Sequence, residues 1–405
     1  MRVLYFHQHF ATPQGASGTR SYEFARALVS RGHQVTVVCG AHQLNGLKLP
    51  YDEKHQWSRG QVAGFEVISL PLPYSNRDSF LRRGITFLKF AWRSVGLALR
   101  EDYDLVFVSS TPITAVIPGL FGKWLRGKPM VFEVRDLWPE LPKALGLKNP
   151  CTLAAMSFLE WAGYHTADAC IGLSPGIVEG IKRRSPPSQQ VHLVPNGADL
   201  ELFHPLHRRR LLLPGIRPEH FVAGFTGAHG IANGLSILLA TAKELQRRGE
   251  TRIKIILIGD GKEKDALQQQ AQQEGLTNCI FYPPMPKTEL AIVTASFDCG
   301  LMVLKNLPAF YHGTSPNKFF DYAAAGIPIV NNYPGWLAEL IEKHEAGLVV
   351  PPDQPVAFAD ALQQLANAPA LREKMGQRAR LLAETEFNRS VLAKKFTAVL
   401  EEAIS

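Results

Sequence analysis

Short apolar runs alternate with amphipathic stretches along this chain, and the alternation predicts its fold. Continuous apolar runs bounded by turn residues are typical of parallel strands buried on both faces of a sheet. In the first half, a helix is expected at Ser21–Arg31. The strands expected there are Val3–Phe6, Val35–Cys39, Leu105–Ser109, Met130–Val134, Cys170–Leu173 and Val191–Val194.

The same pattern starts again after Pro195-Asn196-Gly197 and predicts a second unit. The expected strands are Phe221–Thr226, Ile253–Ile258, Cys279–Tyr282, Gly300–Val303, Pro328–Asn331 and Leu348–Val350. The expected helices are Gly234–Arg248, Lys264–Gln273, Lys318–Ala325, Gly335–Lys343 and Val356–Ala366, followed by amphipathic helices from Leu371. The predicted fold class is therefore α/β, with two doubly wound parallel-sheet domains at 1–195 and 196–387. A basic stretch at 207–210 marks the joint between them.

The composition is that of an ordinary globular protein. Of the 405 residues, 46% are hydrophobic and 20% are charged, which excludes a disordered or collagen-like chain. The five cysteines are scattered and odd in number, so no disulfide framework is expected and a reducing compartment fits. No window has the apolar length of a transmembrane helix, and the first residues do not form a signal peptide. We therefore expect a cytoplasmic protein.

The net charge of +8 is unevenly distributed along the chain. Residues 1–195 hold 22 Lys and Arg against 14 Asp and Glu, whereas the two signs balance in the rest. An excess of this kind suits an anionic membrane surface, an anionic substrate or nucleic acid.

The stretch Phe80–Leu99 lies inside this basic half and mixes large apolar residues with cations. Its bases are Arg82, Arg83, Lys89 and Arg93. A basic helix with an aromatic face is typical of proteins that rest on an anionic bilayer. The alternative is a core-packed helix whose long basic side chains reach solvent.

A glycine loop follows the first predicted strand of each unit. Pro13–Arg20 holds Ser17 and Gly18, and glycine lets the backbone approach a ligand near the free N–H groups of the next helix. The loop is not G-x-G-x-x-G and no acidic residue ends the next strand, so a dinucleotide site is not expected. A tight turn is the alternative.

The loop Thr226–Gly234 repeats this arrangement in the second unit. Backbone N–H groups around Gly227, His229 and Gly230 are candidates to hold a phosphate. The next strand also ends in a glycine turn, which places two more candidate cations nearby. These are Lys262 and Lys264, and solvated surface lysines are the alternative.

A third loop, Tyr311–Pro316, leads into a predicted helix. Its small polar residues suit an anion at a helix N-terminus. Lys318 and Asp321 share a helix face, so a cation for diphosphate would stand beside a carboxylate for ribose hydroxyls. The alternative is a surface ion pair between these two residues. The candidate donor-binding residues of this segment are Thr314, Ser315, Asn317, Lys318 and Asp321.

Several segments, in order along the chain, resemble family 4 retaining glycosyltransferases of the GT-B fold. SPNKFFDYAAAGIPIV resembles the donor-binding segment of that family, and SGTRSYEFARALVSRGHQVTVV resembles its first loop and helix. The other segments are FEVRDLWPE, LSPG, VPNGADLELFHP, IGDGKEKDAL and AGLVVPP. The nearest subgroup is the L-fucosamine transferase type of bacterial O-antigen and capsule assembly.

The resemblance implies that the first domain binds an acceptor and the second a nucleotide diphosphate sugar, in the cleft between them. A helix at about 388–405 is expected to pack back on the first domain. The implied donor is UDP-linked, with an N-acetylated hexosamine as a candidate sugar, and no metal or other cofactor is needed. The acceptor expected is a glycan or a polyprenyl-diphosphate-linked molecule at the inner face of the cell membrane, and no nucleic acid partner is expected. The candidate acceptor-binding residues are His7, His9, Ser17 and Arg20.

Two features depart from the family pattern. Gly313 stands where the first acid of E-x7-E is usual, although Asp321 matches the second. The Arg and Lys that commonly hold diphosphate are replaced by His229 or a neighbour and by Asn233. The diphosphate would then depend on backbone N–H groups and on the lysines named above.

Asp136 is the leading catalytic candidate, because it follows a predicted strand and so lies at the carboxyl end of the sheet. Arg135 and Glu133 are expected to assist it, and a structural role in the turn at Leu137 is the alternative. No second carboxylate is placed as a nucleophile, which suits a front-face departure in which the leaving diphosphate helps deprotonate the acceptor.

Three other interpretations stay open. His7 and His9 would lie on one face of a strand and could chelate zinc, but no further ligand is near in sequence. A nucleotide-sugar epimerase or hydrolase of the same fold would need no acceptor. A non-catalytic subunit would bind the nucleotide without turnover.

Overall fold

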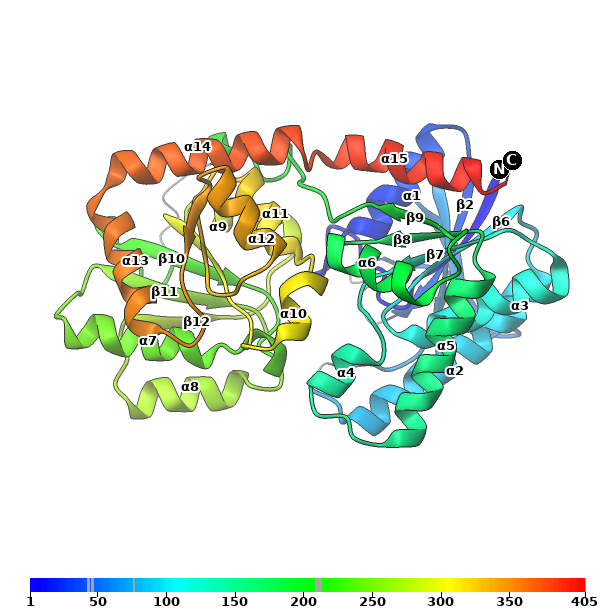
Figure 1. The fold of residues 1–405 in the computed structure, drawn as a ribbon, viewed down its shortest axis with the longest axis horizontal. Helices are drawn as coiled ribbons and strands as arrows, with labels where there is room; N and C mark the ends of the chain where they lie inside the picture. The colour runs from blue at the N-terminus through cyan, green and yellow to red at the C-terminus, as the bar shows by residue number, and fades with distance from the viewer. Residues whose placement is uncertain (42–43, 45–46, 76, 208–212, 405) are drawn as a thin grey trace. The chain divides into compact units, whose positions relative to one another are not determined.

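The computed structural model describes residues 1–41, 44, 47–75, 77–207 and 213–404, and the chain forms two compact units (Figure 1). The first comprises Met1–Pro195, His312–Ser315 and Ser390–Ser405, and the second comprises Asn196–Tyr311 and Pro316–Arg389. Residues 208–210 of the predicted basic stretch lie outside the described residues.

The first unit is built on a nine-stranded sheet in the order β3-β4-β5-β2-β1-β6-β7-β8-β9. The strands are β1 (Arg2–Phe6), β2 (Gln34–Gly40), β3 (Tyr51–Asp52), β4 (Trp57–Val62), β5 (Phe65–Leu70), β6 (Leu105–Ser109), β7 (Met130–Val134), β8 (Ala169–Gly172) and β9 (Gln190–Leu193). Pairing is parallel from β5 to β9, as the buried apolar runs predict.

The far edge of this sheet departs from the prediction of an all-parallel sheet. β3, β4 and β5 were not expected, and β4 pairs antiparallel with both of its neighbours. Ala63 and Gly64, both with positive φ, form the two-residue turn between β4 and β5. β4 is polar and half exposed because it lies near the sheet edge, so it carries no continuous apolar run.

Helices cover both faces of the first sheet. They are α1 (Arg20–Ser30), α2 (Phe80–Arg100), α3 (Val116–Arg126), α4 (Glu140–Ala144), α5 (Pro150–Thr166), α6 (Pro175–Arg184) and α15 (Arg389–Glu402). The side chains of Ser79, Asn149 and Ser174 accept backbone N–H groups and so cap α2, α5 and α6. α3, α4, α5 and α6 were not predicted. α5 has apolar residues on both sides, and α4 and α6 are short.

α15 lies last in the chain but packs in the core of the first unit. The Phe396 ring stacks on Phe24, with centroids 4.3 Å apart, and meets the edge of Phe107 at 5.0 Å. Leu392 and Leu400 join the same core cluster as strands β1 and β2.

The second unit has a six-stranded, fully parallel sheet in the order β12-β11-β10-β13-β14-β15. Its strands are β10 (Phe221–Thr226), β11 (Ile253–Ile258), β12 (Cys279–Tyr282), β13 (Cys299–Met302), β14 (Ile329–Asn331) and β15 (Gly347–Val349). Its helices are α7 (Ser236–Arg247), α8 (Lys264–Gln273), α9 (Lys287–Ala295), α10 (Pro308–Gly313), α11 (Asn317–Ala324), α12 (Trp336–Lys343), α13 (Pro355–Asn367) and α14 (Pro369–Thr385). Only α9 and the short α10 lie outside the predicted helices.

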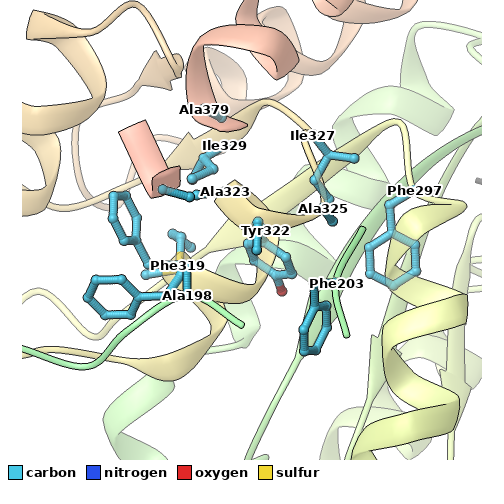
Figure 2. Packing of buried hydrophobic residues seen from close by; sticks show 14 of the residues in the cluster. Ala198, Phe203, Phe297, Phe319, Tyr322, Ala323, Ala325, Ile327, Ile329 and Ala379 are labelled. Carbon is cyan, nitrogen blue, oxygen red and sulfur yellow. The ribbon is translucent and has the colours of Figure 1, made fainter. Parts of the chain in front are cut away.

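α11 is held tightly against this sheet. Figure 2 shows Tyr322 and Phe319 of α11 among the buried side chains of one core cluster. Tyr322 lies over β13 at Gly300, where a Cβ atom would stand 2.3 Å from the ring. The Tyr322 hydroxyl accepts the backbone N–H of Thr226 at 3.0 Å, which fixes α11 to the end of β10.

The predicted fold class, two doubly wound parallel-sheet units, is confirmed. Among the described residues, no helix combines the length and the apolar character needed to cross a membrane.

Candidate active site

Polar side chains of the first unit gather where three adjacent strands end. His7 follows β1, Ser109 ends β6 and Asp136 follows β7. β1 is also where the sheet order reverses, with β2 on one side and β6 on the other. In open α/β sheets, ligands bind outside the carboxyl ends of the strands at such a point.

A buried ion pair forms the base of this cluster. The Arg20 guanidinium contacts Glu133 Oε2 at 2.7 Å, and Ser109 Oγ donates to the other carboxylate oxygen at 2.7 Å. Arg20 also donates to the carbonyls of Pro195 and Val194. Burial alone would raise the pKa of Glu133, but the Arg20 and Arg135 charges hold that pKa below its usual value. Glu133 is therefore an anion, and Arg20 holds it in place.

His7 connects the loop of β1 to that of β7. Its Nδ1 lies 2.8 Å from Ser21 Oγ, and its Nε2 lies 3.2 Å from an Arg135 guanidinium nitrogen. Because a guanidinium can only donate, Nε2 is assigned as the acceptor and the proton is placed on Nδ1. His7 thus acts as a neutral imidazole that orients Arg135.

Asp136 is half-buried at the top of this cluster. Thr111 Oγ1 donates to its carboxylate at 2.9 Å. Burial raises the pKa of Asp136, while the hydrogen bond from Thr111 and the charge of Arg135 oppose the rise. A carboxylate in this setting can orient a hydroxyl group or accept a proton, so the predicted catalytic role remains open to test.

The remaining predicted acceptor-binding residues lie in the loops around the cluster. Ser17 is half-buried in the loop before α1, next to Gly18, which is half-buried too and is a predicted donor-binding residue. His9 packs edge-on against Tyr74 and Phe87, with centroids 4.7 and 6.0 Å away. β1 ends at Phe6, so His7 and His9 do not share a strand face, contrary to the zinc interpretation. Among the described residues, no group of three or more His, Cys, Asp or Glu side chains could hold a metal ion.

In the second unit, two loops meet at the carboxyl ends of β10 and β11. The backbone N–H groups of Gly227 and His229 donate to the carbonyls of Ile258 and Asp260. Gly259 has φ +151°, and a Cβ atom there would lie 1.9 Å from the carbonyl oxygen of Gly227. Only glycine permits this approach, so the two loops form one fixed glycine-rich surface.

The His229 side chain is fully buried beneath this surface. Neither of its ring nitrogens has a hydrogen-bond partner among the described residues. Burial and the neighbouring charge of Lys264 lower the pKa of His229 to about 4. His229 is therefore neutral near pH 7 and cannot replace the cation that the family commonly carries here.

Lys318 supplies a cation to the same surface from the first turn of α11. Its Nζ lies 3.8 Å above the ring centroid of Phe225 and 3.3 Å from Asn233 Oδ1. A Cβ atom at Gly227 would lie 3.4 Å from it. No carboxylate of the described residues pairs with Lys318, and burial lowers its pKa to about 7.

Asp321 lies one turn further along α11 and does not pair with Lys318. Its carboxylate is buried and lies 3.2 Å from Nζ of Lys287, the first residue of α9. The alternative of a surface Lys318–Asp321 ion pair is therefore wrong. Burial raises the pKa of Asp321, and the charges of Lys287 and Arg389 oppose the rise.

The other predicted donor-binding residues differ in their surroundings. Lys264 Nζ donates to the carbonyls of Gly259 and Tyr282, so this side chain ties a loop to the end of β12. Lys262 is exposed, and Gly230, Thr314, Ser315 and Asn317 are half-buried. Contact between these residues and a donor remains a prediction.

Sequence reasoning missed several partners of these residues. Ser109 is the last residue of a predicted strand and Thr111 lies two residues after it, and this position at the carboxyl end was the available signal. The contacts of Lys287 with Asp321 and of Phe225 with Lys318 could not be predicted from the sequence, because they depend on which elements pack together.

Comparisons with known proteins agree with this architecture. Residues 15–197 match the family described as "Glycosyl transferase 4-like domain", and residues 214–382 match "Glycosyl transferases group 1". D-inositol 3-phosphate glycosyltransferase of Paenarthrobacter aurescens is 29% identical over 201 residues. That match covers 48% of this chain, and the chain spans about half the length of this curated relative. WcaI of Escherichia coli, provisionally named a colanic acid biosynthesis glycosyl transferase, is 23% identical over 80% of this chain and 82% of its own length.

Solved structures resemble the fold over nearly the whole chain. Sucrose-phosphate synthase from Thermosynechococcus elongatus superposes with a TM-score of 0.76 and 19% identity, covering 99% of this chain and 98% of that one. Anabaena HepE, solved with UDP-glucose, gives a TM-score of 0.71 and 16% identity, covering 99% and 100%. At these identities the likeness shows the fold alone. The two family matches, which together span most of the sequence, show that this chain belongs to the family 4 glycosyltransferases, and the structural likeness shows that its fold is GT-B.

Proposed function

We propose that the protein transfers a sugar from a nucleotide diphosphate sugar to an acceptor, with retention at the anomeric carbon. The observation that carries this proposal is Lys318, a cation with no carboxylate partner among the described residues, beside a glycine-rich surface at the end of β10. A diphosphate would supply the missing negative charge. The N–H groups of Gly227 and His229 already donate to Ile258 and Asp260, so Lys318 is the main proposed contact at this surface.

The proposed donor is UDP-linked. Lys318 and the backbone around Thr314 and Ser315 hold its diphosphate, and Asp321 accepts hydrogen bonds from the ribose hydroxyls. HepE, which has the same fold, was solved with UDP and with UDP-glucose, and this supports the choice of UDP. An N-acetylated hexosamine is the proposed sugar, on the resemblance to the L-fucosamine transferase type.

The proposed chemistry needs no protein nucleophile. The bond between the anomeric carbon and the diphosphate oxygen breaks, and the acceptor oxygen bonds to that carbon on the same face. The acceptor proton passes to the leaving diphosphate, whose charge Lys318 stabilises. Asp136, held by Thr111, orients the acceptor hydroxyl. No metal or other cofactor is part of this proposal.

The proposed acceptor is a polyprenyl-diphosphate-linked molecule or a glycan of surface polysaccharide assembly, such as O-antigen. WcaI is named for colanic acid biosynthesis, and WaaG, of similar fold, for lipopolysaccharide biosynthesis. An acceptor of this kind stays in the cell membrane, so the protein would work at the inner face, and the basic helix α2 is the proposed contact.

A thermal-shift screen across nucleotide sugars tests the donor, because a ligand at 100 times its Kd adds about 2.7 kcal/mol of stability. The best donor is then incubated with and without a polyprenyl-diphosphate-linked acceptor, using the parent and Asp136→Asn. We expect glycosylated lipid from the parent only. Turnover without acceptor would instead indicate an epimerase or hydrolase, and nucleotide binding without any turnover would indicate a non-catalytic subunit.

A further inference from the structure

α2 carries two separate apolar faces. One faces the sheet, where Phe90, Leu97 and Ala98 join the core. The other is a stripe that points to solvent, and its residues follow the i, i+4, i+7, i+11, i+18 spacing of a single helix face. The stripe consists of Leu81, Ile85, Leu88, Trp92 and Leu99, with exposed fractions from 37% for Leu99 to 76% for Leu81.

Two neighbouring helices continue this exposed apolar character. α3 packs against both α2 and α5, and all three cover the same face of the first sheet (Figure 1). α3 exposes Trp124 and Leu125, and α5 exposes Phe158 and Trp161, whose rings stack. Each of the three helices thus presents one tryptophan that is at least half exposed.

We call the outer side of α2, α3 and α5 the three-tryptophan face, and its charges are almost all positive. The helices contain seven Lys and Arg but a single acid, Glu160, which is buried and bonded to Tyr164 and Arg184. Arg82, Lys89 and Arg100 are exposed.

Three of the four bases expected to face a membrane have other partners. Arg82 pairs with Asp78, with 3.4 Å between Nη1 and Oδ1. Arg83 lies over the rings of Tyr74, Phe80 and Phe87, and Arg93 donates to the backbone carbonyl of Gln56. The long-range attraction is therefore carried mainly by the exposed bases of the face.

We propose that the three-tryptophan face docks on an anionic lipid bilayer. Tryptophan suits a membrane interface, because its ring is apolar and its N–H can bond to water or headgroups. Lys and Arg beside such residues are attracted to anionic headgroups. The apolar stripe and the exposed bases together match a lipid surface, because no exposed carboxylate on these helices would repel it. This inference rests on the proposed function, since it gives the lipid-linked acceptor a surface on which to meet the enzyme.

The test measures binding to vesicles of phosphatidylcholine with about one third phosphatidylglycerol, by co-sedimentation and by tryptophan fluorescence. Trp92→Gln/Trp124→Gln/Trp161→Gln removes the aromatic contacts. The matched control, Ile292→Gln/Val356→Gln/Leu381→Gln, removes three exposed apolar side chains of the second unit. UDP binding by calorimetry is recorded for each variant, so that loss of the fold or of the donor site is seen separately.

We expect the parent and the control to bind these vesicles with a blue shift in emission, and to bind pure phosphatidylcholine more weakly. The triple tryptophan variant should partition about tenfold or more less strongly, because each ring removed loses apolar burial. The inference is overturned if the parent ignores anionic vesicles at low salt, or if the tryptophan variant binds them equally well. It is also overturned if the face proves to be a dimer contact, so that the parent self-associates, the variant does not, and vesicles have no effect. Vesicle binding with no UDP binding would refute the proposed function and leave the docking surface intact.

Discussion

Replacing Lys318 with methionine removes a cation while keeping most of the apolar stem over Phe225. In the proposed complex the ammonium group donates to a diphosphate oxygen, and a hydrogen bond to a charged group is worth about 1.5–3 kcal/mol. The Kd for UDP should therefore rise by about 10- to 150-fold. Uridine, which lacks the diphosphate, should bind the parent and the variant almost equally.

The pH dependence should change with the same substitution. The Lys318 pKa of about 7 means that the ammonium loses its proton as the pH rises through neutrality. The ratio of the parent's UDP affinity to that of the variant should therefore fall between about pH 6 and 8. The ratio is compared because the titration of UDP itself affects both proteins equally.

Stability should respond in the opposite direction to affinity. Between about pH 7 and the unfolded lysine value of about 10.4, the folded state binds fewer protons, so the free energy of unfolding should rise with pH. The methionine variant lacks this component and should be no less stable than the parent at pH 6.

Calorimetry with UDP and uridine, and urea unfolding at several pH values, measure these effects. Lys343→Met, which removes an exposed lysine at the end of α12, is the matched control. Equal losses of UDP and uridine affinity, or a pH-independent ratio, would refute the reasoning.

Three further experiments test the other charged groups. Asp321→Asn should weaken UDP binding by about 1.5–3 kcal/mol, measured by calorimetry, and unchanged UDP affinity would contradict the ribose role. The same substitution should lower the free energy of unfolding, because it leaves the Lys287 cation buried and unpaired. Adding Lys287→Met should restore that stability in urea unfolding but not the UDP affinity. Arg20→Met should cost about 3–5 kcal/mol in urea unfolding, since it leaves Glu133 buried and charged, and a loss below about 1 kcal/mol would contradict the assigned ion pair. Asp136→Asn should lower kcat by about 100-fold or more while UDP affinity stays at the parent value; a normal kcat would leave Asp136 only its structural contact with Thr111.

The sequence predicted the sheets well because their central strands are continuous apolar runs. β6, β7, β10, β11 and β12 begin and end at the residues expected. Of the strands that were missed, β3 and β4 lie at the edge of the sheet, where polar residues interrupt the apolar ones. β5 is buried, but Glu66 and Ser69 interrupt its apolar run. α9 was missed because it is short and its apolar residues show no clear helical period.

The candidate site was predictable only in part. The glycine loops and the carboxylates after strands are local signals, and the structure brings His7, Arg20, Glu133 and Asp136 to one edge of a sheet. The protonation and the ion-pair partner of each side chain were not predictable, because they depend on contacts between residues far apart in the chain. Arg20 and Glu133 are separated by 113 positions, and they meet because α1 begins beside the carboxyl ends of the central strands.

The packing of α15 has a consequence for how the chain is made. A ribosome completes residues 1–195 long before it reaches Phe396, yet that ring lies between Phe24 and Phe107. At about 5–20 residues per second, translation of the intervening second unit takes about 10–40 s. During that interval the first unit lacks the α15 side chains of its core, whereas the second unit has its whole sequence once residue 389 has been made. The part of the protein that emerges first is therefore the last to finish folding, and its unfinished core is the surface that chaperones would meet.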